Sequence, residues 1–319
     1  MLLTTTLHMA FVCTCDGSNR HPLGSTADIR KRAWLHLVGV RDKAAAVEVT
    51  QHPTTPTEEQ DDEKQVDEKE LDLIRRDAGR SLLHRYCRRT QTTPNSPDIS
   101  AVSLAPSGEQ TSQWSRSFTD LQTDLASVLV RCVSNPLGSG QAKLHYYQGL
   151  HDIAGVLMYN LADTDLTCAV LRRICQSHMR DALREDFSGL TWLLDHTALP
   201  LIEQYDEEVH AYLRMAEVSM ANCILPWMIT WFTHDIEASS VSSRLADAFV
   251  ASHPLFPLYF AVALILHPSN REEILEAECD QAMVHMTMLR FAKRLAGDWD
   301  TSGDGIPAQD IIESGIAMM

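Results

Sequence analysis

Apolar residues recur at three- and four-residue intervals along most of this chain, which is the spacing of amphipathic helices. The first such segment runs from Asp28 to Val40, where Ile29, Ala33 and Leu37 form an apolar stripe with Val40. The pattern predicts a helix here that opens the folded region.

A second helical pattern carries polar side chains as well as apolar ones. Its apolar positions form one stripe: Leu71, Ile74, Ala78 and Leu82. Asp77 and Arg80 occupy neighbouring positions of the same predicted helix, because residues three apart lie side by side on a helix surface. The motif Ile74-Arg75-Arg76-Asp77-Ala78-Gly79-Arg80 is therefore expected on a helix.

A second motif follows the next predicted helix. That helix spans Phe118 to Val133 and stops at Asn135-Pro136, since proline cannot continue a helix. A glycine-containing loop through Lys143 leads to Tyr146-Tyr147-Gln148-Gly149, and helical spacing resumes from Asp152. The second motif is thus predicted at a junction between a loop and a helix.

The rest of the chain reads almost entirely as helix. Two strongly apolar stretches, Ala221 to Phe232 and Ala246 to Leu266, are predicted to be central helices because they are hydrophobic around most of their circumference. Trp227 and Trp231 are expected to be buried there rather than to form an aromatic recognition surface. Strand-like alternation is scarce, so the predicted fold class is all-α.

Polar segments interrupt the predicted helical domain, which we place at residues 28–290. Residues 1–27 are expected to be a flexible N-terminus, and residues 291–319 a C-terminal tail. Three segments read as inserted loops: about 49–70, 90–113 and 137–143. The acidic run from Glu58 to Lys64 is more typical of a solvated linker than of a site for a basic partner, because it buries too little apolar area.

Charge and cysteine content narrow the classes of partner. Lys and Arg total 27 against 43 Asp and Glu, a net charge of −16, which disfavours binding to nucleic acid and to anionic membranes. The eight cysteines show no paired CxxC spacing, so reduced thiols in a cytosolic protein are expected rather than disulfides or zinc. The longest apolar run, Leu255 to Leu266, is 12 residues long. A bilayer span needs about 20, so no transmembrane segment is predicted.

Each of the two motifs offers one side chain suited to phosphate hydrolysis. Arg80 is always charged and can donate paired hydrogen bonds to phosphate oxygens. Gln148 can hold a water molecule through one donor and one acceptor without ionising. Taken alone, Arg80 also fits an ordinary solvated helix residue, and Gln148 a structural cap of the following helix.

Other candidate sites have simpler explanations. His151 and Asp152 suggest acid–base chemistry, but a carboxylate in the first turn of a helix is stabilised by the free amides there. The stretch Asp298 to Asp304 resembles the start of a calcium loop, yet Gln309 stands where such a loop needs a glutamate, so a plain turn is expected. No GxxxxGK[ST] or GxGxxG motif occurs, so the chain is not predicted to hydrolyse nucleotide itself.

The ordered series of motifs resembles the TBC-domain GTPase-activating proteins of Rab GTPases. The segment 29–34 resembles the Arg and Trp block that opens this family, residues 74, 77 and 80 fit its IxxDxxR motif, and residues 146 and 148 fit its YxQ motif. Further blocks at 145–153, 225–232 and 252–255 resemble one branch of the family. The resemblance covers about residues 28 to 290.

The resemblance implies an all-helical TBC fold that accelerates GTP hydrolysis on a bound, GTP-loaded Rab. Arg80 would be an arginine finger and Gln148 a second finger that orients the attacking water. Asp77 would orient the guanidinium or pin the local helix, and Tyr146 would support Gln148. Ile74 and Gly149 complete the two motifs as supporting residues. GTP and magnesium would belong to the Rab, so no cofactor is expected in this chain.

The resemblance also implies a cellular setting and leaves one alternative open. The similar branch suggests Rabs of the early secretory pathway, with vesicle traffic between endoplasmic reticulum and Golgi regulated at their cytosolic faces. The two motifs lie farther apart than the family pattern leads us to expect, and the excess lies in 90–113 and 137–143. An inactive TBC-fold binding module for a Rab, with a finger displaced by these insertions, is the alternative.

Overall fold

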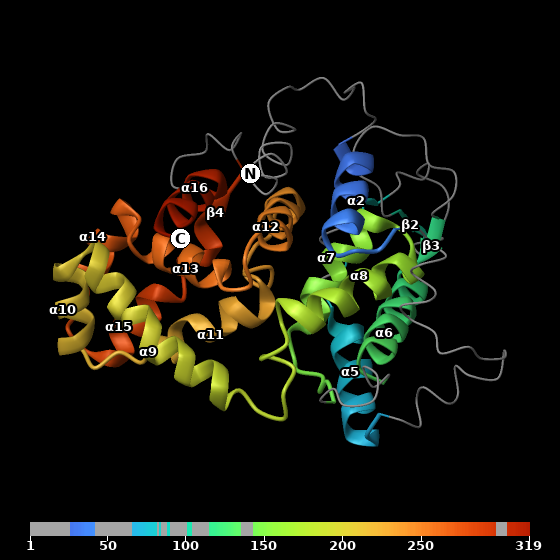
Figure 1. The fold of residues 1–319 in the computed structure, drawn as a ribbon, viewed down its shortest axis with the longest axis horizontal. Coiled ribbons are helices and arrows are strands. Elements are labelled where there is room, and N and C mark those ends of the chain that lie inside the picture. Colours follow the sequence, from blue (N-terminus) through green and yellow to red (C-terminus); the bar gives the residue numbers. More distant parts are fainter. Residues whose placement is uncertain are drawn as a thin grey trace, which may run out of the picture. The chain divides into compact units, whose positions relative to one another are not determined.

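The computed structural model confirms the predicted all-helical architecture (Figure 1). It describes residues 26–41, 66–81, 83, 88–89, 101–103, 115–134, 143–297 and 305–319. Within these residues there are thirteen α-helices, one 3-10 helix and five strands of two or three residues. The chain forms two compact units divided between Glu185 and Asp186. Each unit is described by itself.

Helix α6 is the centre of the N-terminal unit. The helices described in this unit are α2 (Thr26–Leu37), α5 (Glu68–Arg80), α6 (Phe118–Ser134), α7 (Leu150–Leu161) and α8 (Thr164–Ser177). Helix α6 packs against α5, α7 and α8 through the buried side chains of Leu125, Val128 and Leu129. Asp163 caps α8 by accepting hydrogen bonds from two backbone amides of its first turn. The predicted apolar stripe of α5 and the buried faces of α6 and α7 thus meet in one core.

The predicted opening helix is confirmed, with a different end and a different buried face. Helix α2 ends at Leu37, and Gly39 follows with φ +74°, a left-handed conformation that favours glycine. Trp34 is buried, whereas the predicted stripe is only partly buried. Val40 lies beyond the helix and packs in the core nevertheless. Turn chemistry at Gly39 therefore ends the helix before the apolar pattern does.

Two of the predicted loops contain regular structure, which corrects the sequence analysis. Strands β1 (Arg88–Arg89), β2 (Ala101–Ser103) and β3 (Ser115–Ser117) pair antiparallel in the order β1-β2-β3, so part of the 90–113 insertion is a strand. Helix α5 begins at Glu68, inside the predicted 49–70 linker, because the Asp67 side chain accepts the Lys69 amide and caps it. Strand pairing and capping are local contacts that the apolar pattern does not report.

Both apolar stretches predicted to be central helices are helical in the C-terminal unit, but the second, Ala246 to Leu266, is interrupted at Ser252 to Leu255 and belongs to two helices. Its described helices are α9 (Ser188–Tyr205), α10 (Glu207–Met215), α11 (Met220–Thr230), α12 (Ser239–Ala251), α13 (Phe256–Ile265), α14 (Pro268–Glu276), α15 (Gln281–Met288), 3-10 helix η2 (Ala292–Arg294) and α16 (Ala308–Met318). Strands β4 (Leu295–Ala296) and β5 (Ile306–Pro307) pair parallel. The rings of Phe232, Phe249, Phe256 and Phe260 form a cluster with centroids 4.8 to 6.0 Å apart. Trp227 and Trp231 are buried, as expected.

The predicted C-terminal tail is wrong where it concerns residues 308–318, because these form helix α16, which packs on α13. Ile311 and Ile312 are buried in the contact. A Cβ atom on Gly315 would stand 3.2 Å from a ring carbon of Phe256 and 3.3 Å from the Phe260 nitrogen. The glycine therefore permits a close helix–helix approach, which an apolar stripe does not predict.

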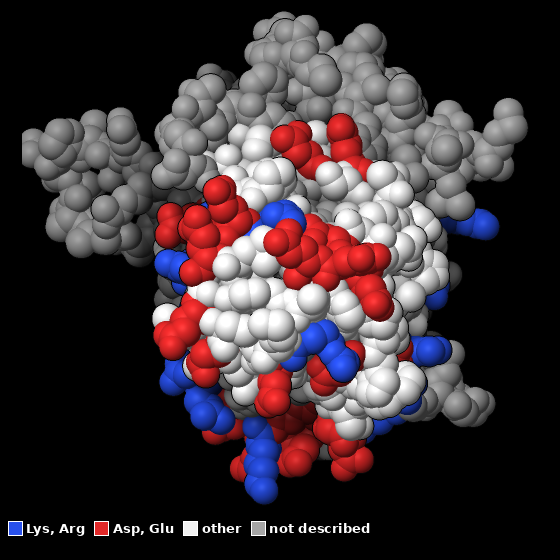
Figure 2. Space-filling model, turned by 90° about the vertical axis from the view of Figure 1, so that its left-hand side faces the viewer, with Lys and Arg blue, Asp and Glu red and all other residues white. Residues whose placement is uncertain are grey.

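Acidic side chains gather in several patches on the face of the C-terminal unit seen in Figure 2. On α10 and α14 they belong to Glu207, Glu208, Glu272 and Glu276. Arg271 forms ion pairs there with Asp206, at 2.6 Å, and with Glu208.

Of the helices that the structure describes, none has both the length and the hydrophobicity needed to cross a bilayer.

Several sequence-based predictions lie outside the described residues. They concern most of the N-terminus, the acidic run 58–64, Leu82 in the apolar stripe of α5, most of the insertion 137–143 and the calcium-like stretch 298–304. The predicted domain limits at 28 and 290 also stay predictions.

Candidate functional site

Helix α5 buries Asp77 and ends at Arg80. The predicted stripe is confirmed at Leu71, Ile74 and Ala78, which are all buried. Asp77 is also buried, with 4% of its surface exposed, whereas Arg80 is exposed at the last position of the helix. No hydrogen bond or ion pair joins the Arg80 side chain to another described residue. Asp77 and Arg80 therefore lie in different surroundings.

The backbone beneath Arg80 is held from two sides. Ser81 caps the C-terminal end of α5, and its hydroxyl donates a 2.8 Å hydrogen bond to the carbonyl oxygen of Ala78. The side-chain amide of Gln122 on α6 donates a 2.8 Å hydrogen bond to the carbonyl of Gly79. Because the last carbonyls of a helix lack partners within the helix, such contacts stabilise its final turn. Sequence analysis missed Gln122, since nothing in its spacing shows that it faces the end of α5.

The second motif lies in the segment that leads into α7. The backbone amide of His145 donates to the carbonyl of Leu183 at 2.8 Å. Glu70 of α5 accepts a hydrogen bond from the backbone amide of Tyr146, and its other carboxylate oxygen lies 3.8 Å from the Lys143 ammonium. Glu70 and Lys143 were also missed by sequence analysis. Their contacts fasten this segment directly to the helix that carries the first motif.

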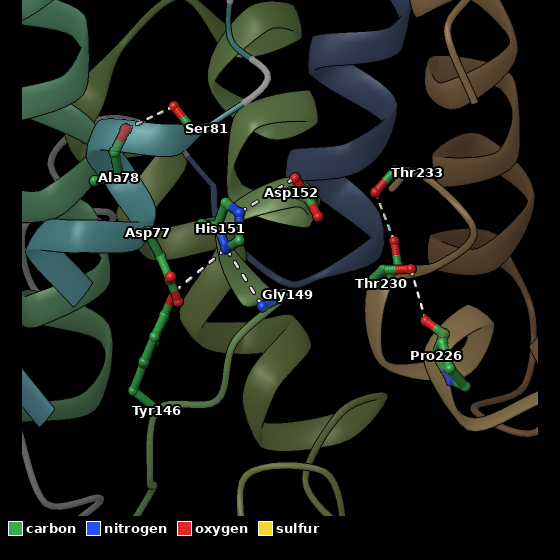
Figure 3. A network of polar contacts seen from close by, with 10 residues as sticks. All are labelled: Asp77, Ala78, Ser81, Tyr146, Gly149, His151, Asp152, Pro226, Thr230 and Thr233. Atoms are coloured by element: carbon green, nitrogen blue, oxygen red, sulfur yellow. Dashed lines mark hydrogen bonds and ion pairs between the residues drawn. The ribbon is translucent and has the colours of Figure 1, made fainter. Parts of the chain in front are cut away.

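Tyr146 joins the two motifs through its side chain. Its hydroxyl donates a 3.0 Å hydrogen bond to Oδ2 of Asp77 and lies 3.3 Å from Nδ1 of His151 (Figure 3). Burial, and after it the Asp77 carboxylate, raises the pKa of Tyr146 well above its ordinary value. The phenol is therefore a neutral donor. Of the two roles predicted for Asp77, this contact supports pinning of the local helix.

Gln148 and Gly149 follow directly. Gln148 is exposed, and no hydrogen bond joins its side chain to another described residue. Gly149 is buried with φ +119°, a value that side-chain-bearing residues rarely adopt, and α7 begins at the next residue. The predicted junction between loop and helix is confirmed. The glycine permits the sharp change of direction that leaves Gln148 on the surface.

His151 and Asp152 face inward at the start of α7. His151 lies 3.3 Å from the backbone nitrogen of Gly149 and 3.4 Å from Oδ1 of Asp152. Both side chains are buried, so the acid–base pair considered from the sequence is part of the internal network in Figure 3.

Figure 3 also shows hydrogen bonds within the C-terminal unit. The Thr233 hydroxyl donates to the Thr230 carbonyl at 2.6 Å, and the Thr230 hydroxyl donates to the Pro226 carbonyl at 2.8 Å.

The arrangement therefore presents two exposed polar side chains on segments that buried and partly buried hydrogen bonds hold together. Tyr146 and Asp77 provide one link, and Glu70 with the Tyr146 amide provides another. An exposed guanidinium and an exposed amide can both reach a ligand carried by a second protein. In the part of the chain that the structure describes, no three His, Cys, Asp or Glu side chains are grouped as metal ligands.

Known proteins are similar to this chain in sequence over part of its length and in fold. A family model, the Rab-GTPase-TBC domain, matches residues 115–275. That range contains Tyr146, Gln148 and Gly149 but begins after the IxxDxxR motif on α5.

Two curated relatives are similar over part of their length. The chain is 33% identical over 176 residues to TBC1 domain family member 20 of Bos taurus, covering 55% of this chain and 41% of that protein. It is 34% identical over 140 residues to GTPase-activating protein gyp10 of Schizosaccharomyces pombe, covering 44% and 36%. The chain thus spans less than half the length of either relative.

A solved structure shares the fold along the whole chain. The crystal structure of the Ypt/Rab-GAP domain of Gyp1p superimposes with a TM-score of 0.60 at 12% identity, covering 99% of this chain and 97% of that one. At this identity the likeness establishes the fold alone. Because the family model also matches half of the 319 residues, this chain belongs to the Rab-GTPase-TBC domain family.

Proposed function

We propose that this chain is a GTPase-activating protein that accelerates GTP hydrolysis by a Rab GTPase. Membership of the Rab-GTPase-TBC domain family and similarity to a protein named as a GTPase-activating protein support the proposal. The observation that carries it is that Arg80 and Gln148 are both exposed, and that the 3.0 Å hydrogen bond between Tyr146 and Asp77 joins the segments on which they lie.

Arg80 acts as the arginine finger in this proposal. Negative charge develops on the transferring phosphoryl group, and a guanidinium stabilises it through paired, charge-assisted hydrogen bonds. Such a residue accelerates hydrolysis about 10³- to 10⁵-fold, which lowers the barrier by roughly 4 to 7 kcal/mol. A place at the last position of α5 suits this role, because the side chain extends from a fixed helix end.

Gln148 acts as the second finger and orients the attacking water in place of the glutamine of the GTPase. Its amide offers a donor and an acceptor, so it can hold the water and contact the phosphate at once. The GTP and the Mg²⁺ belong to the GTP-bound Rab, because the sequence has no phosphate-binding loop of its own. The activity is therefore exerted on a partner.

We also propose that the Rab served here belongs to the early secretory pathway, at the cytosolic face of endoplasmic reticulum or Golgi membranes. Similarity to TBC1 domain family member 20 supports this setting. Fluorescently tagged chain should colocalise with markers of these membranes, and an exclusive association with endosomes would contradict it.

Single-turnover GTP hydrolysis by a panel of Rabs, with and without the chain, tests the proposed activity and names the substrate. Intact chain should accelerate at least one Rab, and Arg80→Ala and Gln148→Ala should each reduce that acceleration about 10²-fold or more, leaving a measurable remainder. Arg75→Ala is the matched control, since Arg75 is exposed on the same helix about 140° around its axis from Arg80. Binding to a Rab without acceleration of any would indicate the alternative, an inactive recognition module.

A further inference from the structure

His151 contacts the chain on both sides of Gln148. Its Nδ1 atom lies 3.3 Å from the hydroxyl of Tyr146, two residues before Gln148, and 3.3 Å from the backbone nitrogen of Gly149, the residue after it. Its Nε2 atom lies 3.4 Å from Oδ1 of Asp152. The ring is 8% exposed, so these three contacts are shielded from water. One imidazole therefore bridges the two ends of the turn that carries exposed Gln148.

The neighbours of the His151 ring indicate which of its two nitrogens carries the proton in the neutral form. A backbone N–H only donates, so Nδ1 must accept from Gly149. A neutral imidazole that accepts at Nδ1 carries its proton on Nε2, which then points at the carboxylate of Asp152. The opposite tautomer would place two N–H groups against each other at Gly149 and a lone pair against the carboxylate. The Nε2–H form therefore satisfies Gly149 and Asp152, while the Tyr146 hydroxyl, whose proton goes to Asp77, makes only a 3.3 Å contact with Nδ1.

The contact with Gly149 fixes the backbone of the glutamine itself. The N–H of Gly149 and the carbonyl of Gln148 lie in one rigid peptide plane. We infer that His151 is a positioning residue for Gln148. By setting this peptide plane, it orients the exposed side-chain amide of Gln148 before a GTPase binds. This inference rests on the proposed function. It concerns geometry, and His151 itself need not touch the nucleotide.

The same hydrogen bond also has a purely structural interpretation. The first amides of a helix lack partners within the helix, and a side chain from the first turn that accepts the N-cap amide stabilises the helix start. In that case loss of His151 would lower the stability of α7 without a specific effect on Gln148. The two interpretations differ in what happens when Gln148 is already absent.

Amide exchange and ¹⁵N NMR of histidine-labelled chain test the geometry without any GTPase. The His151 ring should show the Nε2–H tautomer, with its signal assigned by its loss in His151→Asn. Exchange of the Gly149 amide should be about threefold to tenfold faster in His151→Leu and close to normal in His151→Asn, whose Oδ1 replaces Nδ1 as acceptor. His145→Leu, in the same segment, is the matched control and should leave this amide unchanged. An Nδ1–H tautomer, or equal exchange in intact chain and His151→Leu, would overturn the inference.

Single-turnover kinetics test the connection to Gln148. His151→Leu should lower the maximal stimulated rate about tenfold to 10²-fold while the half-saturating concentration of chain stays constant, because a misplaced group costs rate rather than binding. His151→Asn should recover most of the rate. In the Gln148→Ala background, His151→Leu should change the rate by less than about twofold, since the two residues act as one unit. An equal loss in both backgrounds would show that His151 acts elsewhere.

The two sets of measurements separate failure of the inference from failure of the proposed function. If intact chain accelerates no Rab, the proposed activity fails, and NMR and exchange still decide whether His151 fixes the turn. If intact chain is active and His151→Leu is equally active, the positioning role fails while the proposed function stands.

Discussion

Arg80 ends a regular helix, whereas Gln148 lies in an irregular turn between a loop and a helix. Around Arg80 the backbone is held by helical bonds, by Ser81 and by one amide from α6. Around Gln148 it is held by the buried side chains of Tyr146 and His151 and by a left-handed glycine. A helix terminus positions a side chain with little outside help, while an irregular turn needs a dedicated polar network. Changes to the two regions should therefore have different consequences.

The largest expected effect comes from the helix side. Arg80→Lys keeps the positive charge but loses the planar, paired donors, so we expect the stimulated rate to fall about 10³-fold with little loss of stability. Single-turnover hydrolysis together with thermal melting would measure both quantities. A lysine variant with nearly full activity would mean that a point charge suffices at this position.

Each region contains a glycine, and replacing it by alanine should change stability in opposite directions at the two sites. Gly149→Ala forces a side chain into φ +119° and should lower the free energy of unfolding by about 1 to 3 kcal/mol. Gly79→Ala on α5 is its counterpart, because a Cβ there meets no atom within 4 Å, and it should raise stability by up to about 1 kcal/mol. Urea unfolding of the two variants measures the difference. Destabilisation of equal size at both sites would contradict the contrast between a regular and an irregular support.

Removal of the Tyr146 hydroxyl breaks the bond that joins the two regions. Tyr146→Phe leaves the buried Asp77 carboxylate without this donor and should cost about 1 to 2 kcal/mol of stability at pH 7. The folded protein raises the pKa of Tyr146, so the contribution of its neutral form is complete below the unfolded value of about 10 and is lost as the pH rises above it. Unfolding curves at pH 7 and pH 11 should show the difference between variant and parent shrinking. Superimposable curves at pH 7 would contradict the role of this bond.

The smallest effect is expected at Gln122. Gln122→Glu keeps the size of the side chain but removes the donor to the Gly79 carbonyl, so the last turn of α5 should loosen. The site is exposed, and we expect a loss of under about 1 kcal/mol in stability with a severalfold fall in stimulated rate. Gln122→Lys, which restores a donor, should recover part of the rate. If both variants match the parent, the helix end positions Arg80 without help from α6.

Sequence reasoning was most successful where regular periodicity decides the structure. The described part of the α5 stripe, the span of α6 and the helical character of α7 from Asp152 onward were predictable, because burial of an apolar face sets helical spacing. The family resemblance supplied the assignment of Arg80 and Gln148 as fingers, and that assignment stays a proposal.

The polar network was not predictable in the same way. Glu70 and Gln122 act across tertiary contacts with segments distant in the sequence, so spacing along the chain carries no trace of them. His151 was considered only for acid–base chemistry, because its use as an acceptor for Gly149 depends on the path of the turn. Helix α16 was missed because its contact with α13 depends on the small size of Gly315 as much as on an apolar stripe.

The most direct test of the two-finger account uses a substrate Rab whose own catalytic glutamine has been replaced by alanine. Single-turnover hydrolysis is measured with intact chain, with Gln148→Ala and with Arg80→Ala. If Gln148 supplies the water-orienting amide, intact chain should still accelerate the altered Rab, and both variants should fail to do so. Loss of acceleration by intact chain on the altered Rab, with full activity on the normal Rab, would contradict the account and leave the chain with a single finger.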